Sequence, residues 1–499
     1  MGARIFAWPI ASALLGVAAF APIRFSWLAG LVSLVPLFLF FRSEERLWRL
    51  LAGTTLFRLI FLVGVAYSGF EPLGLLASLL MFLGLPLSYA LVRRFAGAPA
   101  AFWSLPFSWT LWDLLHARYT FLPTYDLMMG SAFGSSPLLG LAGWGGVAGL
   151  TLYVAVVNAL VAAVIAAGSR TYRLLAAGGA MLLAVAGWIA SEELLAGRAT
   201  AYAARPRELG IAVISSREDF DHPFRAFGSD TLSPAELERA AEFTAQTLRP
   251  IRDEVRGHGV DLVAFPEDLI DIESWGDADP EAYEKFGIES GGVLIRAYRS
   301  LARELDTNVA ATFTTIQAGR RYNTTLLFNR TGALVGRYNK VHLAIGGEYW
   351  PFGDWRPFYW NIEWIRRGQA EISEESAIFD PHNQYTAGEP TTLRADAFTF
   401  ASPICIEAQD PGLLRTFRQQ GAEFLLHTSN NRWVPFGLTR YLRLMDNFRR
   451  IEAVRLDAPI VFNGKAERAG IITPDGRLEA VPFERGDKPY NVLFATLRI

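Results

Sequence analysis

The chain has 499 residues, of which 51% are hydrophobic and 19% are charged, and its formal net charge is −2 at pH 7. This length favours more than one domain. The chain is nearly neutral and shows no concentrated basic face, so nucleic acid is not an expected partner. The single cysteine, Cys405, excludes an intrachain disulfide framework.

The first 200 residues are predicted to form a membrane domain. They contain 12 Arg, no Lys and 7 Asp or Glu, so their net charge of +5 contrasts with −7 for the rest of the chain. Apolar runs lie near residues 5–22, 25–41, 50–70, 72–92, 99–115, 142–168 and 172–191. Several reach the roughly 20 residues that cross ~30 Å of hydrocarbon, so we predict a multi-span α-helical membrane domain of about seven spans within residues 1–195.

The arginines between these runs predict the orientation of the spans. One side carries Arg4, Arg42, Arg46, Arg49, Arg93, Arg94, Arg170 and Arg173, whereas the opposite short loops carry only Arg24 and Arg118. The arginine-rich side of a membrane protein usually faces the cytoplasm. An odd number of spans would therefore place the rest of the chain on the outer side of the membrane.

Beyond residue 205 the pattern changes to short apolar strands that alternate with amphipathic helices. Strands are predicted at 210–216, 260–267, 308–316, 323–329, 398–407 and 422–430, and helices at 232–259 and 291–305. Ser233 followed by Glu236 is typical of a helix N-terminus. The alternation predicts an α/β layered domain over residues 205–499.

Three predicted strand ends of this domain carry residues whose side chains could together form a catalytic site. Glu267 ends the segment AFPE, Lys340 lies in GRYNKVHL and Cys405 lies in SPICIE. A thiol becomes a nucleophile when a base takes its proton and a nearby cation stabilises the thiolate. Burial would raise the pKa of Glu267 into the range of a general base, and Lys340 would stabilise the thiolate and an oxyanion.

Each of the three residues taken alone has a simpler interpretation. Cys405 would be an inert core thiol, Glu267 a surface charge at the end of a strand, and Lys340 a solvated loop cation. Lys340 is nevertheless informative, because the chain has only four lysines and uses Arg almost everywhere else. It is the combination of the three residues with their flanks that indicates a catalytic site.

With these flanks, the chain resembles the nitrilase superfamily, whose Glu-Lys-Cys triad occurs in this order on an αββα sandwich. Apolar spans ahead of such a domain resemble the apolipoprotein N-acyltransferase family. The likeness covers nearly the whole chain and includes the segments FAPIRFSWLAGLVSLVPLF, YNKVHL, GEYWPFGDW, PICIE, SNNRW and DNFRRIEAVRLDAPIVFNGKAERAGIITPDGRL. The resemblance implies a membrane domain followed by a nitrilase-like sandwich.

The resemblance also implies roles for particular residues. Glu267 would be the base, Lys340 the stabiliser of the transition state and Cys405 the acylated nucleophile, with Glu348 and Glu407 as supporting carboxylates. The implied reaction moves a fatty acyl group from a phospholipid, through a Cys thioester, to the N-terminal amine of the diacylglyceryl-cysteine of a lipoprotein. We expect a monomer in the bacterial inner membrane, with its catalytic domain on the periplasmic side.

The chain departs from this family at several positions. Ile406 stands where the family has an aromatic residue, a Val-Pro pair follows Trp433, residues 353–376 differ from the family's flap, and no long apolar run follows residue 430. These departures indicate a divergent or specialised member of the family.

An aromatic segment beside Lys340 contains Trp350, Trp355 and Trp360. Ordinary packing would explain it equally well. Amphipathic rings also favour the depth of lipid headgroups, so we predict a lid or a lipid-facing belt.

Two other functions stay open. A membrane-tethered nitrilase-type amidase would use the same three residues on a small amide, although one span would suffice to anchor it. A non-catalytic transporter or binding protein would not need the three residues intact. The six histidines show no metal-ligand spacing and no phosphate-binding glycine loop occurs, so we expect neither a metal nor a nucleotide, and no cofactor.

Overall fold

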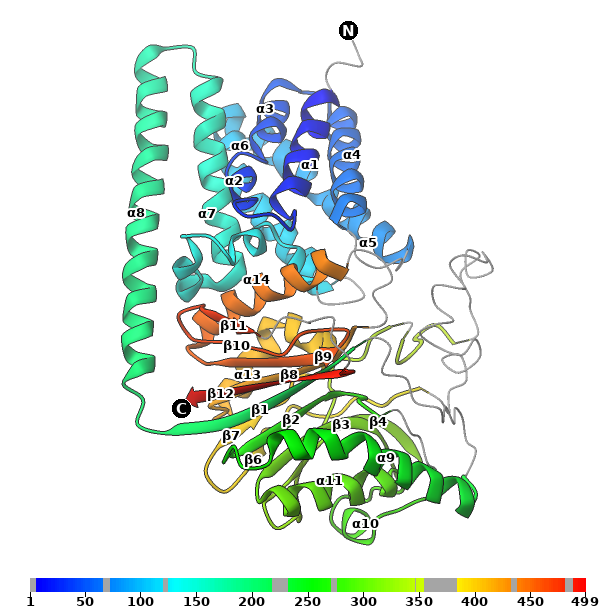
Figure 1. The fold of residues 1–499 in the computed structure, drawn as a ribbon. Coiled ribbons are helices and arrows are strands. Elements are labelled where there is room, and N and C mark those ends of the chain that lie inside the picture. The colour runs from blue at the N-terminus through cyan, green and yellow to red at the C-terminus, as the bar shows by residue number, and fades with distance from the viewer. Residues whose placement is uncertain are drawn as a thin grey trace. The chain divides into compact units, whose positions relative to one another are not determined.

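The chain folds as two compact units. A helical unit comprises residues 1–200, 434–457 and 474–477, and a sheet unit comprises residues 201–433, 458–473 and 478–499. The computed structural model describes residues 6–65, 72–119, 124–217, 232–270, 276–345, 347–353, 384–431, 438–480 and 488–499. The order predicted from the sequence, apolar helices followed by an α/β sheet domain, is confirmed (Figure 1).

The helical unit consists of apolar helices, several of them long. They are α1 (Ala7–Ala19), α2 (Trp27–Gly30), α3 (Val35–Ser43), α4 (Leu47–Val65), α5 (Pro72–Phe82), α6 (Gly84–Tyr119), α7 (Ala142–Ile165), α8 (Arg170–Ala203) and α14 (Leu438–Leu456). Among the described residues, four helical stretches are long and apolar enough to cross a membrane: Leu47–Val65, Leu76–Tyr119, Leu139–Ile165 and Arg170–Ala203. The second of them bends at Gly97, whose φ is +86°. The count of seven spans stays a prediction.

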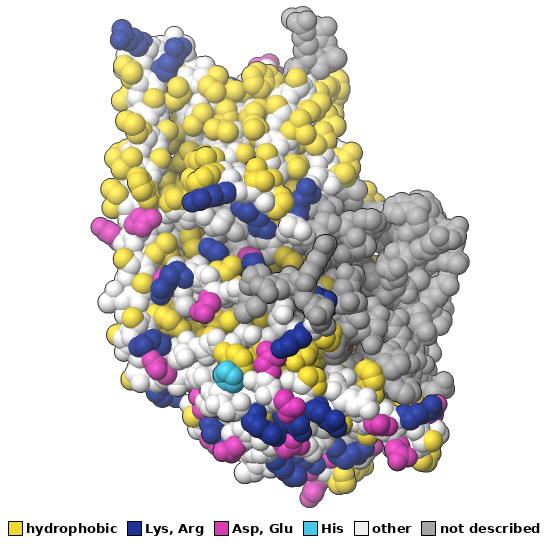
Figure 2. Space-filling model, in the orientation of Figure 1, with side chains coloured by type: hydrophobic (Ala, Val, Ile, Leu, Met, Phe, Trp, Pro, Cys, Tyr) yellow, Lys and Arg dark blue, Asp and Glu magenta, His cyan; other side chains and the backbone are white. Residues whose placement is uncertain are grey.

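The surface of the helical unit is apolar. Within the described part of the chain, 30 of the 33 exposed large hydrophobic side chains lie between Trp8 and Ile189. Figure 2 shows hydrophobic side chains gathered over the exposed face of this unit. An apolar surface of this extent is not stable in water but suits contact with lipid. The helical unit therefore has the surface of a membrane protein.

Helix α14 belongs to the helical unit although it lies far along the chain. Its residues Leu444, Phe448, Ile451 and Val454 share one hydrophobic core with α1, α3, α4, α6 and α7. Their spacing of three or four residues places them on one face of the helix. A side chain at Gly134 would meet the backbone oxygen of Asn447 at 2.2 Å, so glycine is required where α14 approaches.

In the part of the chain that the structure describes, the sheet unit has twelve strands. They are β1 (Glu208–Ser216), β2 (Leu262–Glu267), β3 (Asn308–Gln317), β4 (Arg320–Phe328), β5 (Leu334–Asn339), β6 (Leu393–Arg394), β7 (Thr399–Ala401), β8 (Phe424–Asn430), β9 (Ile460–Lys465), β10 (Gly470–Ile472), β11 (Leu478–Ala480) and β12 (Tyr490–Arg498). The main order is β5-β4-β3-β2-β1-β9-β8-β7-β6, with β12 paired to β1 and β10 paired to β9 and β11. Strands β3, β2, β1, β9, β8 and β7 run parallel.

The two halves of this sheet face one another. Among the described residues, β1 and β9 pair in register only at Ser216 and Lys465, so the sheet is nearly divided there. Side chains bond from half to half: Thr325 Oγ1 lies 3.0 Å from Ser402 Oγ, and Asn463 Nδ2 donates to the carbonyl oxygen of Ala264 at 3.0 Å. Polar groups of the two halves therefore contact one another directly.

Helices cover the two halves of the sheet, and those at Pro234–Val255 and Gly292–Leu305 agree with the helices predicted at 232–259 and 291–305. They are α9 (Pro234–Val255), α10 (Pro280–Phe286), α11 (Gly292–Leu305) and α13 (Pro411–Gln419). Helices α9 and α11 lie side by side and share a core with β1 to β4 (Figure 1). The predicted cap of α9 is confirmed, because Glu236 Oε2 accepts from the backbone N–H of Ser233 at 2.8 Å while Ser233 Oγ accepts from Glu236 N.

The predicted strand 398–407 is shorter than expected. Strand β7 ends at Ala401, and Cys405 lies in a 3-10 turn, Cys405–Gln409. The run FTFASPICIE is apolar throughout, so its composition does not distinguish the strand from the buried turn that follows it.

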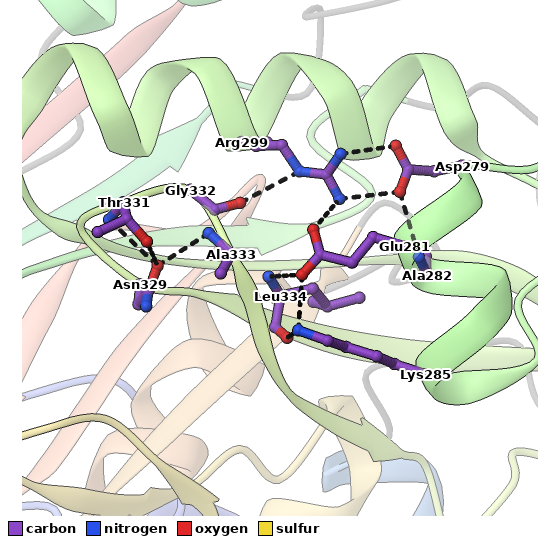
Figure 3. A network of polar contacts seen from close by, with 10 residues as sticks. All are labelled: Asp279, Glu281, Ala282, Lys285, Arg299, Asn329, Thr331, Gly332, Ala333 and Leu334. Carbon is purple, nitrogen blue, oxygen red and sulfur yellow. Dashed lines mark hydrogen bonds and ion pairs between the residues drawn. The ribbon is translucent and has the colours of Figure 1, made fainter.

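A polar network fixes the hairpin that leads to Lys340 (Figure 3). Arg299 on α11 bonds with both carboxylate oxygens of Asp279 at 2.8–2.9 Å, with Glu281 at 2.8 Å and with the carbonyl oxygen of Gly332 at 3.1 Å. Lys285 joins Glu281 to the carbonyl oxygen of Leu334. The network connects α10 and α11 with the turn between β4 and β5.

Replacing Arg299 with Ala is expected to destabilise the sheet unit by about 3–5 kcal/mol, because it leaves the buried carboxylate of Asp279 without its cation. A lower unfolding temperature in detergent would show the effect. Arg303 offers the control, since it lies on the same helix and makes one exposed bond to the carbonyl oxygen of Thr331. Equal losses for Arg299→Ala and Arg303→Ala would contradict the role given to the network.

Candidate functional site

Cys405 is held in an unusual backbone conformation. Its φ is +53°, in the left-handed region that residues other than Gly seldom adopt. The preceding Ile404 pairs with Thr428 of β8, and His427 Nε2 donates to the carbonyl oxygen of Cys405 at 2.9 Å. Such strained positions gather at functional sites, so the turn itself marks Cys405 as a candidate nucleophile.

Lys340 directly follows β5 and is buried. Its Nζ donates to Glu348 Oε1 at 2.8 Å, and its backbone N–H donates to the carbonyl oxygen of Asn323 at 2.9 Å. Burial by itself would lower the pKa of Lys340, but attraction to the ionised forms of Glu348, Cys405 and Glu267 raises it above its ordinary value. Lys340 is therefore a permanent cation in this site.

Glu267 ends β2 and is also buried. Burial raises its pKa, the charge of Lys340 opposes this, and the charge of Glu348 raises the pKa further. A carboxylate with a raised pKa is able to accept and return a proton near neutral pH.

Asn323 links the two carboxylates, and the sequence gives no direct sign of this role. Its Nδ2 donates to Glu267 Oε1 at 2.6 Å and to Glu348 Oε1 at 3.0 Å. Because Glu348 also holds Lys340, one chain of hydrogen bonds runs from Glu267 through Asn323 and Glu348 to the ammonium. The only signal in the sequence is a polar residue near the start of a strand, NTTLLF.

The thiol of Cys405 shares this electrostatic environment. Burial raises its pKa to about 12, the charge of Lys340 lowers it, and the charges of Glu267 and Glu348 raise it. The structure thus brings together Glu267, Lys340, Cys405 and Glu348. The resting thiol is protonated, so any nucleophilic step from it needs a base.

Glu407 connects the segment of Lys340 to the turn of Cys405. Its Oε1 accepts from the backbone N–H groups of Val341 at 2.6 Å and His342 at 3.0 Å, and its Oε2 accepts from the N–H of Ile404 at 2.7 Å. The hydroxyl of Tyr338 adds a bond of 2.8 Å. The carboxylate positions Lys340 relative to Cys405 by binding the backbone next to each.

The predicted aromatic lid lies mostly outside the described residues. Trp350 is buried, and its ring packs edge-on against Phe352 at 5.1 Å, whereas Trp355 and Trp360 lie outside the described part. The lid stays a prediction. Among the described residues, no three His, Cys, Asp or Glu side chains gather as a metal site would require.

Family models match both parts of the chain. Residues 233–495, more than half of the chain, match the carbon–nitrogen hydrolase model. The chain belongs to the carbon–nitrogen hydrolase family. Residues 12–160 match the model of the apolipoprotein N-acyltransferase N-terminal domain, so the resemblance found in the sequence is confirmed for both parts.

Individual relatives are distant. The chain is 29% identical over 172 residues to apolipoprotein N-acyltransferase 1 of Treponema pallidum, covering 33% of this chain and 29% of that protein. It is 26% identical over 221 residues to apolipoprotein N-acyltransferase of Agrobacterium fabrum, covering 44% and 37%. These alignments span about a third of each relative. The crystal structure of a carbon–nitrogen hydrolase from Helicobacter pylori G27 aligns with 14% identity and a TM-score of 0.37, covering 58% of this chain and 89% of that one.

Alkylation of the single thiol by iodoacetamide tests the site independently of any substrate. With a pKa of about 12, the thiolate fraction of Cys405 is expected to rise about tenfold per pH unit from pH 7 to pH 10, because the pH stays below the pKa. Lys340→Met removes the stabilising cation and should slow alkylation at every pH in this range.

Lys488→Met serves as the matched control, since Lys488 is exposed and pairs with Glu254, away from the network that fixes the Lys340 hairpin. A plateau of the alkylation rate below pH 9, or the same rate in Lys340→Met and wild type, would contradict the electrostatics described for the site.

Proposed function

We propose that the protein is an N-acyltransferase of the bacterial inner membrane. It moves a fatty acyl group from a phospholipid to the N-terminal amine of the diacylglyceryl-cysteine of a lipoprotein. One observation supports the proposal most directly: Cys405 is buried beside Lys340 and Glu267, in a chain whose first 200 residues contain several long apolar helices. Both substrates of such a transfer are anchored in lipid. The match of residues 12–160 to an acyltransferase domain supports the proposal.

The first half of the reaction forms a thioester. Glu267 accepts the proton of the Cys405 thiol, and the sulfur attacks the ester carbonyl of the phospholipid. The ammonium of Lys340 and the backbone N–H of Ile406, which bonds to the sulfur, stabilise the oxyanion. The ester C–O bond then breaks, and Glu267 returns the proton to the departing lysophospholipid oxygen.

The second half of the reaction forms the amide. The neutral amine of the acceptor attacks the thioester carbonyl, a C–N bond forms, the C–S bond breaks, and the proton of the amine passes to Glu267 and on to the thiolate. Lys340 again stabilises the oxyanion. No metal or cofactor takes part in either half. Glu348 keeps Lys340 in place and Glu407 positions the turn of Cys405.

The surrounding assignments follow from the same proposal. The sheet unit would work on the periplasmic side, where lipoproteins are exposed, and the chain would act as a monomer. Trp350, Trp355 and Trp360 would border the path by which the two lipid-anchored substrates enter in turn.

Incubation with phospholipid alone should trap the thioester. Mass spectrometry is expected to find one fatty acyl mass on the peptide that carries Cys405, and neutral hydroxylamine should remove it. Cys405→Ala should abolish the adduct. Lys340→Met should slow its formation by roughly 10²–10³-fold through loss of an oxyanion contact, and Glu267→Gln by about 10²–10⁴-fold through loss of the base.

The same experiment separates acyl transfer from hydrolysis. If water releases the acyl group as fast as an amine does, the membrane-tethered amidase replaces the acyltransferase. If neither phospholipids nor amides give an adduct, the assignment of the three residues is wrong.

A further inference from the structure

A buried histidine on β8 contacts the backbone of Cys405. His427 is 1% exposed, and its Nε2 lies 2.9 Å from the carbonyl oxygen of Cys405. Its neighbour Thr428 pairs with Ile404, so β8 runs alongside the turn that carries the thiol. A carbonyl oxygen only accepts hydrogen bonds, so Nε2 carries a proton and donates it. None of the steps of the proposed reaction uses this side chain.

Two peptide groups flank the α-carbon of Cys405, and a hydrogen bond fixes each of them. In the first group, the carbonyl oxygen of Ile404 accepts from the backbone N–H of Glu407 at 3.2 Å. In the second group, the carbonyl oxygen of Cys405 accepts from His427. A left-handed φ such as the +53° of Cys405 persists only where its surroundings impose it. The bond from His427 is therefore part of what imposes the conformation of the turn.

The second peptide group also carries the N–H of Ile406. In a planar trans peptide the C=O bond and the following N–H bond point in opposite directions. A donor that binds the carbonyl oxygen of Cys405 on one side therefore directs the N–H of Ile406 to the other side, where it bonds to the sulfur. His427 thus sets the direction of this N–H without contacting it.

Loss of the donor would leave a buried carbonyl oxygen without a hydrogen bond, which is unfavourable. Rotation of the peptide group toward another donor would relieve this cost, and it would also relieve the left-handed strain at Cys405. The same rotation would turn the N–H of Ile406 away from the sulfur. The contact on the sulfur therefore depends on a residue on the opposite side of the peptide group.

We propose that His427 is a positioning residue, which holds the N–H of Ile406 on the sulfur of Cys405 and, during acyl transfer, on the oxyanion. The inference deepens the proposed function, because it names the residue that directs one of the two oxyanion contacts. His427 takes no proton in the reaction and acts through the peptide group between Cys405 and Ile406.

Alkylation of the full chain in detergent micelles tests the effect on the sulfur and needs no phospholipid. His427→Leu removes the donor, whereas His427→Gln places an amide N–H at about the reach of Nε2. Between pH 7 and pH 10, His427→Leu is expected to react with iodoacetamide about tenfold more slowly than wild type, because the thiolate has lost a hydrogen bond. His427→Gln should restore the rate to within about twofold of wild type.

Thioester formation from phosphatidylglycerol tests the effect on the oxyanion. At saturating phospholipid the rate for His427→Leu should fall by about 10²-fold, because an oxyanion contact is displaced. The phospholipid concentration that gives half of the maximal rate should stay unchanged, since the contact belongs to the transition state. His427→Gln should again approach wild type. The loss should exceed that in alkylation, in which no oxyanion forms.

Asn308→Leu is the matched control. Asn308 is also buried, and its Nδ2 donates to the carbonyl oxygen of Asp261 at 2.8 Å. It pairs with Leu262 at the start of β2, away from the strand end that carries Glu267. This variant should lower the unfolding temperature without changing the rate of alkylation or of thioester formation.

Three outcomes bear on the inference in different ways. Wild-type rates in His427→Leu would refute it, and so would equal losses in His427→Leu and His427→Gln, which would assign the imidazole to packing alone. If His427→Leu does not fold, His427→Asn takes its place, because its shorter amide falls short of the carbonyl oxygen and should also give slow reaction. Absence of a thioester in wild type would refute the acyl transfer, while the alkylation rates would still decide the role of His427.

Discussion

The ammonium of Lys340 is the one positive charge on which the candidate site depends. Removing an ion from water is costly unless an opposite charge and hydrogen bonds replace its hydration. Glu348 supplies both at 2.8 Å. Glu348 is hydrogen-bonded to Lys340. The positive charge of Lys340 also acts on Glu267 and Cys405, whose pKa values it lowers, so that it favours their ionised forms.

The neighbouring residues keep this charge in position. Asn323 spans from Glu267 to Glu348, and Glu407 binds the backbone on both sides of the site. The Arg299 network fixes the hairpin from which Lys340 emerges. The position of a single ammonium is thus determined by hydrogen bonds from three different segments.

The sequence predicted the parts of this arrangement that are local. Glu267, Lys340 and Cys405 each follow or end an apolar run, so their meeting at one sheet edge could be inferred. The left-handed turn at Cys405 could not, because an apolar run hides where β7 ends. The bridging role of Asn323 also depends on contacts between strands that are far apart in the chain.

Helix α14 shows a second limit of the same kind. Its apolar face, with Leu444, Phe448 and Ile451 at helical spacing, predicts burial but not the surface against which it packs. In an α/β domain a helix between two parallel strands ordinarily covers their own sheet. Here it shares the core of the membrane helices, and only the three-dimensional structure reveals this.

The place of α14 in the helical unit has a consequence for biosynthesis. The ribosome completes the first 200 residues long before residues 434–457 and 474–477, which finish the helical unit. During that interval the hydrophobic residues of the helical unit that pack against Leu444 and Phe448 are not yet covered by α14. Strands β1 to β8 are synthesised in the same interval. The last step of bundle assembly therefore waits for a segment flanked by β8 and β9, and truncation after β8 would leave the bundle, as well as the sheet, incomplete.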